Sequence, residues 1–142
     1  MLVTGTTSNR IEAYVQRVAD YLGLADTEAF VEVELKKHCD GMAGGYCHGD
    51  TDSVYIEIAN NDSVGRIPIK DKLINIAHEM IHAQQIATGR LINCGFAFKP
   101  DGTTLTTKQI FEDVEYLGVR YDEQPWENEA YALEKTVYEA CK

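Results

Sequence analysis

Hydrophobic positions along the chain follow two different periods, and these predict three helices and two strands. Apolar residues recur every three or four positions in Asn9–Gly23, Asp71–Thr88 and Pro125–Ala140, as expected for helices. They alternate with polar residues in Phe30–Lys37 and Val54–Ala59, as expected for strands with one buried face. The order of these elements predicts an α+β fold.

Other features refine this prediction. Asn9 with Glu12 predicts a capping box at the start of the first helix. The second helix is apolar around most of its axis, which is typical of a buried helix. The segment Leu91–Gln124 has no regular pattern apart from a short helix expected near Lys108–Glu115. We expect the residues between His82 and Glu129 to form mainly a loop or lid. A chain of 142 residues has the size of one domain, and residues 1–142 are predicted to form a single domain.

Charge and composition restrict the classes of function. The sequence has 13 basic and 23 acidic residues and no stripe of lysines, so nucleic acid is not an expected partner. It contains no apolar run long enough for a membrane span, and residues 1–10 lack the basic and apolar regions of a signal peptide. These features predict a cytoplasmic protein without a membrane partner, in which the four cysteines are reduced.

The strongest chemical signal is the segment His78-Glu79-Met80-Ile81-His82, inside the predicted buried helix. Histidines at positions i and i+4 lie one turn apart on the same helix face, so both imidazoles can reach one Zn²⁺ ion. Glu79 follows the first histidine, where its carboxylate can take a proton from a zinc-bound water without binding the metal. This spacing is the helical motif of zinc peptidases. The simpler alternative is that His78 and His82 are hydrogen-bonded residues of the core.

A catalytic zinc site needs a third protein ligand, and no histidine follows His82. The last predicted helix offers acidic residues instead. Glu129 shares the apolar face of that helix, whereas Glu127 lies on a more polar face. Because we expect a metal ligand to point into the core, we predict Glu129 as the third ligand. Glu127 is then a residue that supports a ligand through a hydrogen bond, or an ordinary acid in the first turn of the helix.

A second group of candidate ligands flanks a glycine-rich turn and consists of His38, Cys39, Cys47 and His48. This set is competent to bind zinc, but its spacing differs from that of common structural zinc sites. Neighbouring residues on a strand also point to opposite sides. Buried thiols in a strand–turn–strand unit are therefore the simpler interpretation. Candidates for stabilising an oxyanion are His48, Tyr46, Tyr116, Tyr121, Tyr131 and Tyr138.

The two motifs together resemble a known family. HEMIHAQQ on one helix, followed by PWENEAYALE on another, is similar to the small SprT-like or minigluzincin peptidases of phages and bacteria. In gluzincins the third ligand is a Glu followed by Ala and often preceded by Asn, which Asn128-Glu129-Ala130 matches. The resemblance covers about two thirds of the chain, from Val54 to the C-terminus. It implies a zincin-like fold and, if the protein is phage-encoded, a location in the host cytoplasm. It also implies an edge strand at Val54–Ala59 that binds the substrate chain by β-augmentation. The simpler alternative is that Val54–Ala59 is an ordinary strand of the core.

We therefore predict a zinc metallopeptidase of the gluzincin type, which hydrolyses a peptide or protein substrate. Zn²⁺ would be bound by His78, His82 and Glu129, with Glu79 as the general base. One alternative is a non-catalytic module on the same fold, which binds zinc or uses its acidic surface to bind a partner. Another is an acidic phage-type protein that acts on a host factor, with both histidines packed in its core.

Overall fold

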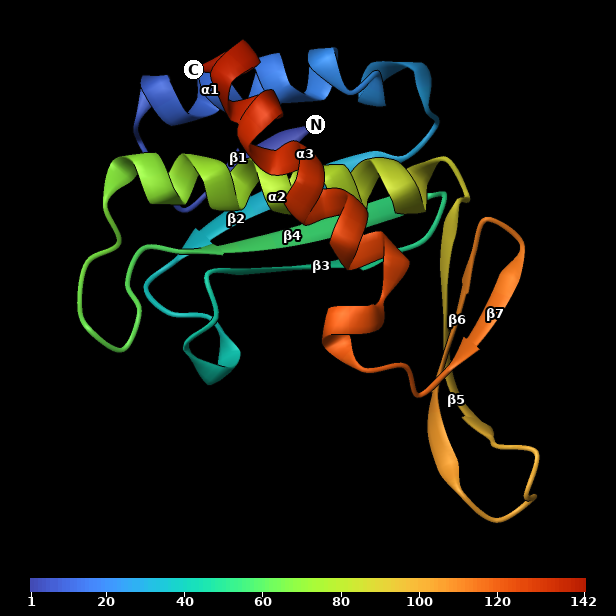
Figure 1. Ribbon diagram of the computed structural model, residues 1–142. Helices are drawn as coiled ribbons and strands as arrows, with labels where there is room; N and C mark the ends of the chain where they lie inside the picture. Colours follow the sequence, from blue (N-terminus) through green and yellow to red (C-terminus); the bar gives the residue numbers. More distant parts are fainter.

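The computed structural model describes residues 1–142 and contains three helices and two sheets (Figure 1). The first sheet has four strands: β1 (Leu2–Thr4), β2 (Phe30–Lys36), β3 (Gly45–Gly49) and β4 (Ser53–Ala59). The second sheet has three strands: β5 (Leu91–Phe98), β6 (Leu105–Phe111) and β7 (Val114–Leu117). The helices are α1 (Asn9–Tyr21), α2 (Ile69–Ala87) and α3 (Pro125–Cys141). The predicted α+β class is confirmed, as are the three helices and both strands.

The four-stranded sheet has the order β1-β2-β4-β3. Strands β1, β2 and β4 are parallel, and β3 pairs antiparallel with β4 at the edge. The helix α2 packs on one face of this sheet, and α1 and α3 pack against α2 (Figure 1). This arrangement explains why α2 is apolar nearly all round: it is enclosed by the sheet on one side and by two helices on the other.

Three details differ from the sequence predictions. The strand β4 lies inside the sheet between β2 and β3, so the prediction of an edge strand at Val54–Ala59 is wrong, and the two edge strands are β1 and β3. Ser8, rather than Asn9, caps α1, because its side chain accepts a hydrogen bond from the Ile11 amide. The predicted helix near Lys108–Glu115 is also wrong.

That segment instead forms the hairpin β6–β7 of the second sheet, which extends away from the body of the protein (Figure 1). Glu112 and Asp113 both adopt positive φ, at 49° and 67°, which is the backbone of a two-residue hairpin turn. The expected loop or lid is therefore largely an antiparallel sheet, joined to α3 by residues 118–124. No helix of the structure combines the length and the hydrophobicity that crossing a membrane requires.

Candidate metal centre

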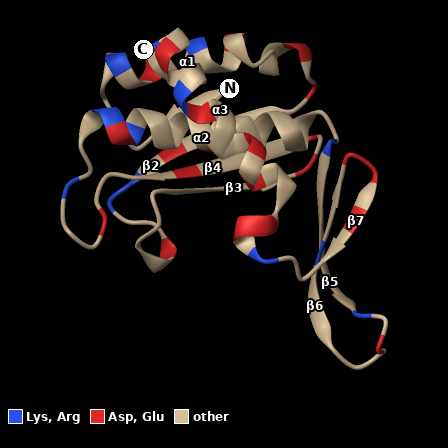
Figure 2. Ribbon diagram, in the orientation of Figure 1, with Lys and Arg blue, Asp and Glu red and all other residues tan.

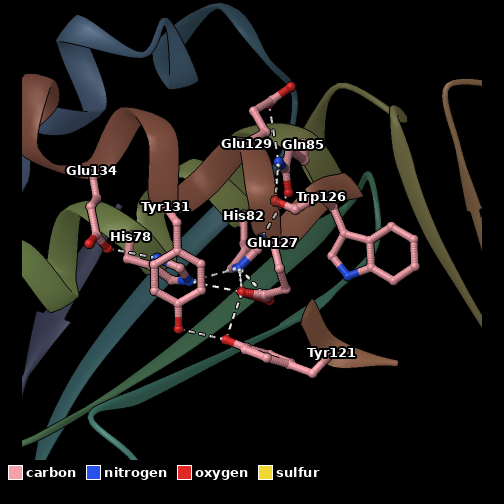
Figure 3. Close-up of polar contacts among 9 residues, drawn as sticks. All are labelled: His78, His82, Gln85, Tyr121, Trp126, Glu127, Glu129, Tyr131 and Glu134. Atoms are coloured by element: carbon pink, nitrogen blue, oxygen red, sulfur yellow. Dashed lines mark hydrogen bonds and ion pairs between the residues drawn. The ribbon is translucent and has the colours of Figure 1, made fainter. Parts of the chain in front are cut away.

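Two histidines of α2 and one glutamate of α3 meet in a buried cluster between these helices (Figure 3). His78 Nε2 and His82 Nε2 lie 3.2 Å apart. Glu127 Oε1 lies 3.0 Å from the first nitrogen and 3.1 Å from the second, and Glu127 Oε2 lies 2.9 Å from His82 Nε2. The three side chains are only 9%, 7% and 12% exposed. The predicted pairing of the two histidines on one helix face is confirmed.

The other nitrogen of each imidazole is held by a separate partner. His78 Nδ1 lies 2.9 Å from Glu134 Oε2, and His82 Nδ1 lies 2.8 Å from Gln85 Oε1. The orientation of the Gln85 amide is fixed, because its Nε2 donates to the Trp126 carbonyl at 3.1 Å. Both partners of the histidines are therefore acceptors, and each Nδ1 carries a hydrogen. In the neutral imidazoles, both Nε2 lone pairs then face the Glu127 carboxylate.

Three acceptors that face one another require a cation between them, either protons or a metal ion. Without a metal, protons fill this role: burial opposes the charged imidazoles, but Glu127 and Glu79 raise the pKa of both His78 and His82. Burial also opposes the charged carboxylate of Glu127, but its hydrogen bonds with the two histidines lower its pKa to about 2.

The donor set fits a metal ion. For bonds of about 2.0–2.1 Å, neighbouring donor atoms of a tetrahedral zinc site lie about 3.3 Å apart, close to the separations in the cluster. Imidazoles that donate their second N–H to a carboxylate or amide oxygen, as His78 does to Glu134, are typical of protein metal sites. The cluster is therefore a buried His-His-Glu group that could hold a metal ion.

Glu79 lies beside this cluster, on the wall of a cavity of about 180 Å³ that His78 also lines. The side chain is buried, and it forms no hydrogen bond with the rest of the protein. Burial, partly offset by the positive charges of His82 and His78, raises the pKa of Glu79 to about 7. A carboxyl group without a protein partner that titrates near neutral pH is suited to proton transfer.

The glycine-rich turn before β3 has a specific role in forming this cavity. A Cβ atom on Gly45 would lie 2.9 Å from Glu79 Cγ and 2.9 Å from the backbone oxygen of Glu57. A Cβ atom on Gly44 would lie 2.6 Å from the Asn75 side chain. Only residues without a side chain allow the edge strand to approach α2 this closely.

Two of the five candidate tyrosines line the cavity. Tyr121 donates its hydroxyl hydrogen to Glu127 Oε1 at 3.0 Å, and Tyr131 donates to the Tyr121 oxygen at 2.9 Å. The Tyr131 ring also packs on His78, with ring centroids 4.6 Å apart. The other three tyrosines and His48 do not line this cavity.

The structure does not bring Glu129, the ligand predicted from the sequence, to the two histidines. This residue is not part of the cluster, and its carboxylate forms two hydrogen bonds with the Arg90 guanidinium, at 2.9 Å and 2.6 Å. It also accepts a hydrogen bond from Gln85 Nε2, whose amide oxygen holds His82. Glu129 therefore contacts the cluster only through Gln85, and Glu127 occupies the position expected for the third ligand.

The way residues are distributed around the axis of α3 explains why Glu127, rather than Glu129, lies at the histidines. Trp126, Ala130 and Val137 on its apolar face are buried in the core, as expected. Glu127 and Glu134 lie seven residues apart, so they share a more polar face, and that face points at the histidines of α2 (Figure 3). This spacing of two acids over two turns was the available sequence signal that Glu127 faces the histidines.

The second group of candidate ligands does not come together. His38, Cys39, Cys47 and His48 form no cluster with the geometry of a metal site, and all four cysteines are free thiols. Cys39 packs with Ala59 and Ile67 in a small apolar cluster. His48 on β3 packs against Tyr55, with ring centroids 5.3 Å apart. Burial, followed by the charge of Glu79, raises the pKa of Cys47, which keeps this thiol protonated.

Comparison of the chain with protein-family models and with curated proteins gives no match, so the interpretation of the site depends on its own geometry.

Proposed function

We propose that the protein is a zinc-dependent peptidase whose metal is bound by His78, His82 and Glu127. The observation that carries the proposal is the convergence of two Nε2 atoms and one carboxylate on one buried point, with Glu79 beside it on a cavity wall. Two imidazoles and one carboxylate are a donor set that suits catalytic zinc. Such a set leaves a coordination position for water or substrate.

A bound zinc ion supplies a Lewis acid and lowers the pKa of a coordinated water to about 7. Glu79 is the general base: its carboxylate accepts the proton of the attacking water and then donates it to the leaving amine. The absence of a protein hydrogen bond leaves both carboxylate oxygens of Glu79 available for these transfers. Tyr121 and Tyr131 line the same cavity, but their hydroxyl hydrogens are donated to Glu127 and to the Tyr121 oxygen, so donation to the carbonyl oxygen of the substrate requires one of these bonds to break.

The edge strand β3 offers a binding site for an extended peptide. Its outer edge carries backbone N–H and C=O groups that β4 does not pair. The strand begins at Gly45, and Gly44 and Gly45 line the cavity with Glu79. A peptide added to β3 as a further strand would therefore pass the catalytic cavity, as β-augmentation requires.

The SprT-like or minigluzincin family is part of this proposal, with one departure. The motif places the ligand at Glu129, in Asn128-Glu129-Ala130, whereas the structure brings Glu127 to the histidines. Glu127 and Glu129 belong to the same Pro-Trp-Glu-x-Glu-Ala run, so a glutamate of the last helix remains the proposed third ligand. The zincin-like fold is supported by the position of α2 on the sheet, next to an edge strand.

The variant Glu79→Gln tests the mechanism. It keeps the size of the side chain and all three proposed ligands, so we expect wild-type zinc content and at least a 100-fold loss of kcat/KM, which is the usual contribution of a general base. Wild-type protein and variant would be compared on a library of fluorescence-quenched peptides, with zinc content measured on the same samples. Undiminished cleavage by the variant would reject Glu79 as the base. A wild-type protein that holds one zinc and cleaves no peptide would favour the non-catalytic zinc-binding module.

A further inference from the structure

A second cavity, of about 850 Å³, shares no lining residue with the cavity at the metal centre. It is formed by residues 5–8 after β1, residues 60–61 after β4, Arg66 and the first turn of α2. Strands β1 and β4 are both parallel to β2, so the cavity lies at the carboxyl ends of parallel strands. In α/β proteins this edge of the sheet is where ligands bind.

The charge of the cavity is opposite to that of the whole chain. The sequence has 23 acidic and 13 basic residues, yet the ten residues that line the cavity include Arg66 and Lys72 and no acid. Basic and acidic residues both occur at the start of α2 and in the loop before it (Figure 2), but only the basic residues Arg66 and Lys72 line the cavity. A cavity with these charges in an acidic protein selects for anions.

Lys72 is a buried basic residue without an acidic partner. The residue is only 5% exposed, and its ammonium group forms a single hydrogen bond, to Asn60 Oδ1 at 2.9 Å. No carboxylate lies within ion-pair distance of Lys72 or of Arg66. Burial and then the charge of Arg66 lower the pKa of Lys72. A buried ammonium without a counter-ion is costly, and an anion in the cavity would remove that cost.

Two helix N-termini open onto the same cavity. The helix α1 begins at Asn9 after the segment Thr6–Ser8, and α2 begins at Ile69 after Pro68. Ser8 caps α1, but α2 has no side-chain cap. The first amide of α2 with a backbone acceptor is that of Lys72, which donates to the Pro68 carbonyl, so the three amides before it are free. Free amides and the positive end of the helix dipole both favour a negatively charged group.

We infer that this cavity binds a small phosphorylated molecule, with its phosphate between Lys72, Arg66 and the first turn of α2. A phosphate has enough acceptor oxygens to satisfy the ammonium, the guanidinium and the free amides together. The cavity volume exceeds that of a free phosphate and falls in the range of pockets for small organic ligands. The site is independent of the proposed peptidase activity: Lys72 precedes His78 by six residues, about 9 Å along the axis of α2 and on another side of the helix.

Calorimetric titration tests this inference, with inorganic phosphate and glycerol 3-phosphate as the two probes. The buffer contains EDTA, so that phosphate cannot bind a metal ion at the histidine cluster, and sodium chloride holds the ionic strength constant. The variants are Lys72→Met and, as the matched control, Lys70→Met, which removes the same charge from an exposed position in the same helical turn.

We expect both probes to bind the wild type, and glycerol 3-phosphate to bind more tightly than inorganic phosphate, because its organic part also contacts the cavity. Lys72→Met should weaken binding by at least about tenfold, as expected for the loss of a hydrogen bond to a charged group, and Lys70→Met should change it less than threefold. Phosphate should also raise the Tm of the wild type and of Lys70→Met but not that of Lys72→Met, whose folding is checked by circular dichroism. Equal affinities for the two lysine variants, or no binding of either probe to the wild type at 10 mM, would overturn the inference. If Lys72→Met is unfolded, Arg66→Gln provides the same comparison at an exposed residue.

Discussion

The choice between Glu127 and Glu129 as the third metal ligand can be tested with a matched pair of substitutions. Glu127→Gln and Glu129→Gln make the same chemical change two residues apart on α3. The first removes a charge that touches both histidines. The second removes a charge that touches Arg90 and reaches His82 only through Gln85. We therefore expect the two variants to differ sharply in zinc affinity.

The structure gives the size of the expected difference. The pKa of Glu127 falls from 4.5 to about 2, which corresponds to roughly 3 kcal/mol of preference for a negative charge at this position. A zinc ion in place of the imidazole protons depends on the same charge, so Glu127→Gln should weaken zinc binding by about 100-fold or more. Glu129→Gln should weaken it less than about tenfold, because Gln85 can still donate to the new amide oxygen. Its main effect should be a small decrease in stability, since the ion pair with Arg90 is partly exposed.

The assay is a competition between the protein and a chromogenic zinc chelator, with bound zinc counted by mass spectrometry on protein purified without a His tag. Circular dichroism and Tm are measured on each variant to confirm folding. A larger loss of zinc affinity in Glu129→Gln than in Glu127→Gln would refute the assignment and restore the ligand predicted from the sequence. Equal, small losses would show that neither Glu127 nor Glu129 binds the metal.

Three further predictions follow from the geometry of the site. The pKa values of His78 and His82 are raised, and a protonated imidazole has no lone pair at Nε2, so zinc affinity should fall as pH decreases through these values; equal affinities at pH 8 and pH 6 would contradict this. Glu134→Gln should lower zinc affinity 10- to 100-fold in the same competition assay, because Glu134 orients His78; a change below threefold would show that this contact is not needed. Gly45→Ala should lower the stability by about 1–3 kcal/mol and displace Glu79, because the new methyl group meets both Glu79 and the backbone of β4; an unchanged Tm measured by calorimetry would contradict the packing.

Most of the fold could be predicted because most of its elements have a local signal. The helix α2 is marked by its apolar residues, and β2 and β4 by strict alternation. The position of β4 within the sheet has no local signal, because it depends on the antiparallel partner β3. That partner is a short strand after a glycine-rich turn, with only one half-buried thiol and little apolar surface of its own. The hairpin β6–β7 was missed for a related reason: its turn, Glu112-Asp113, contains no glycine or asparagine to indicate positive φ.

The candidate site likewise has one part with a local sequence signal, the histidine pair, and one part that depends on the packing of two helices, the third acid. The distance between His78 and His82 is set by one turn of one helix, so the sequence alone was sufficient for this pair. The third acid depends on how α3 crosses α2, which no local pattern contains. Choosing the acid on the apolar face assumed that a ligand must share the environment of the core, but the face of α3 that meets the histidines is polar. It is buried because Glu127 and Glu134 pair with imidazoles, not because it is hydrophobic. For a buried ionic cluster, the better sequence criterion is therefore a pair of acids on one helix face at the spacing of two turns, which can pair with two histidines on a neighbouring helix.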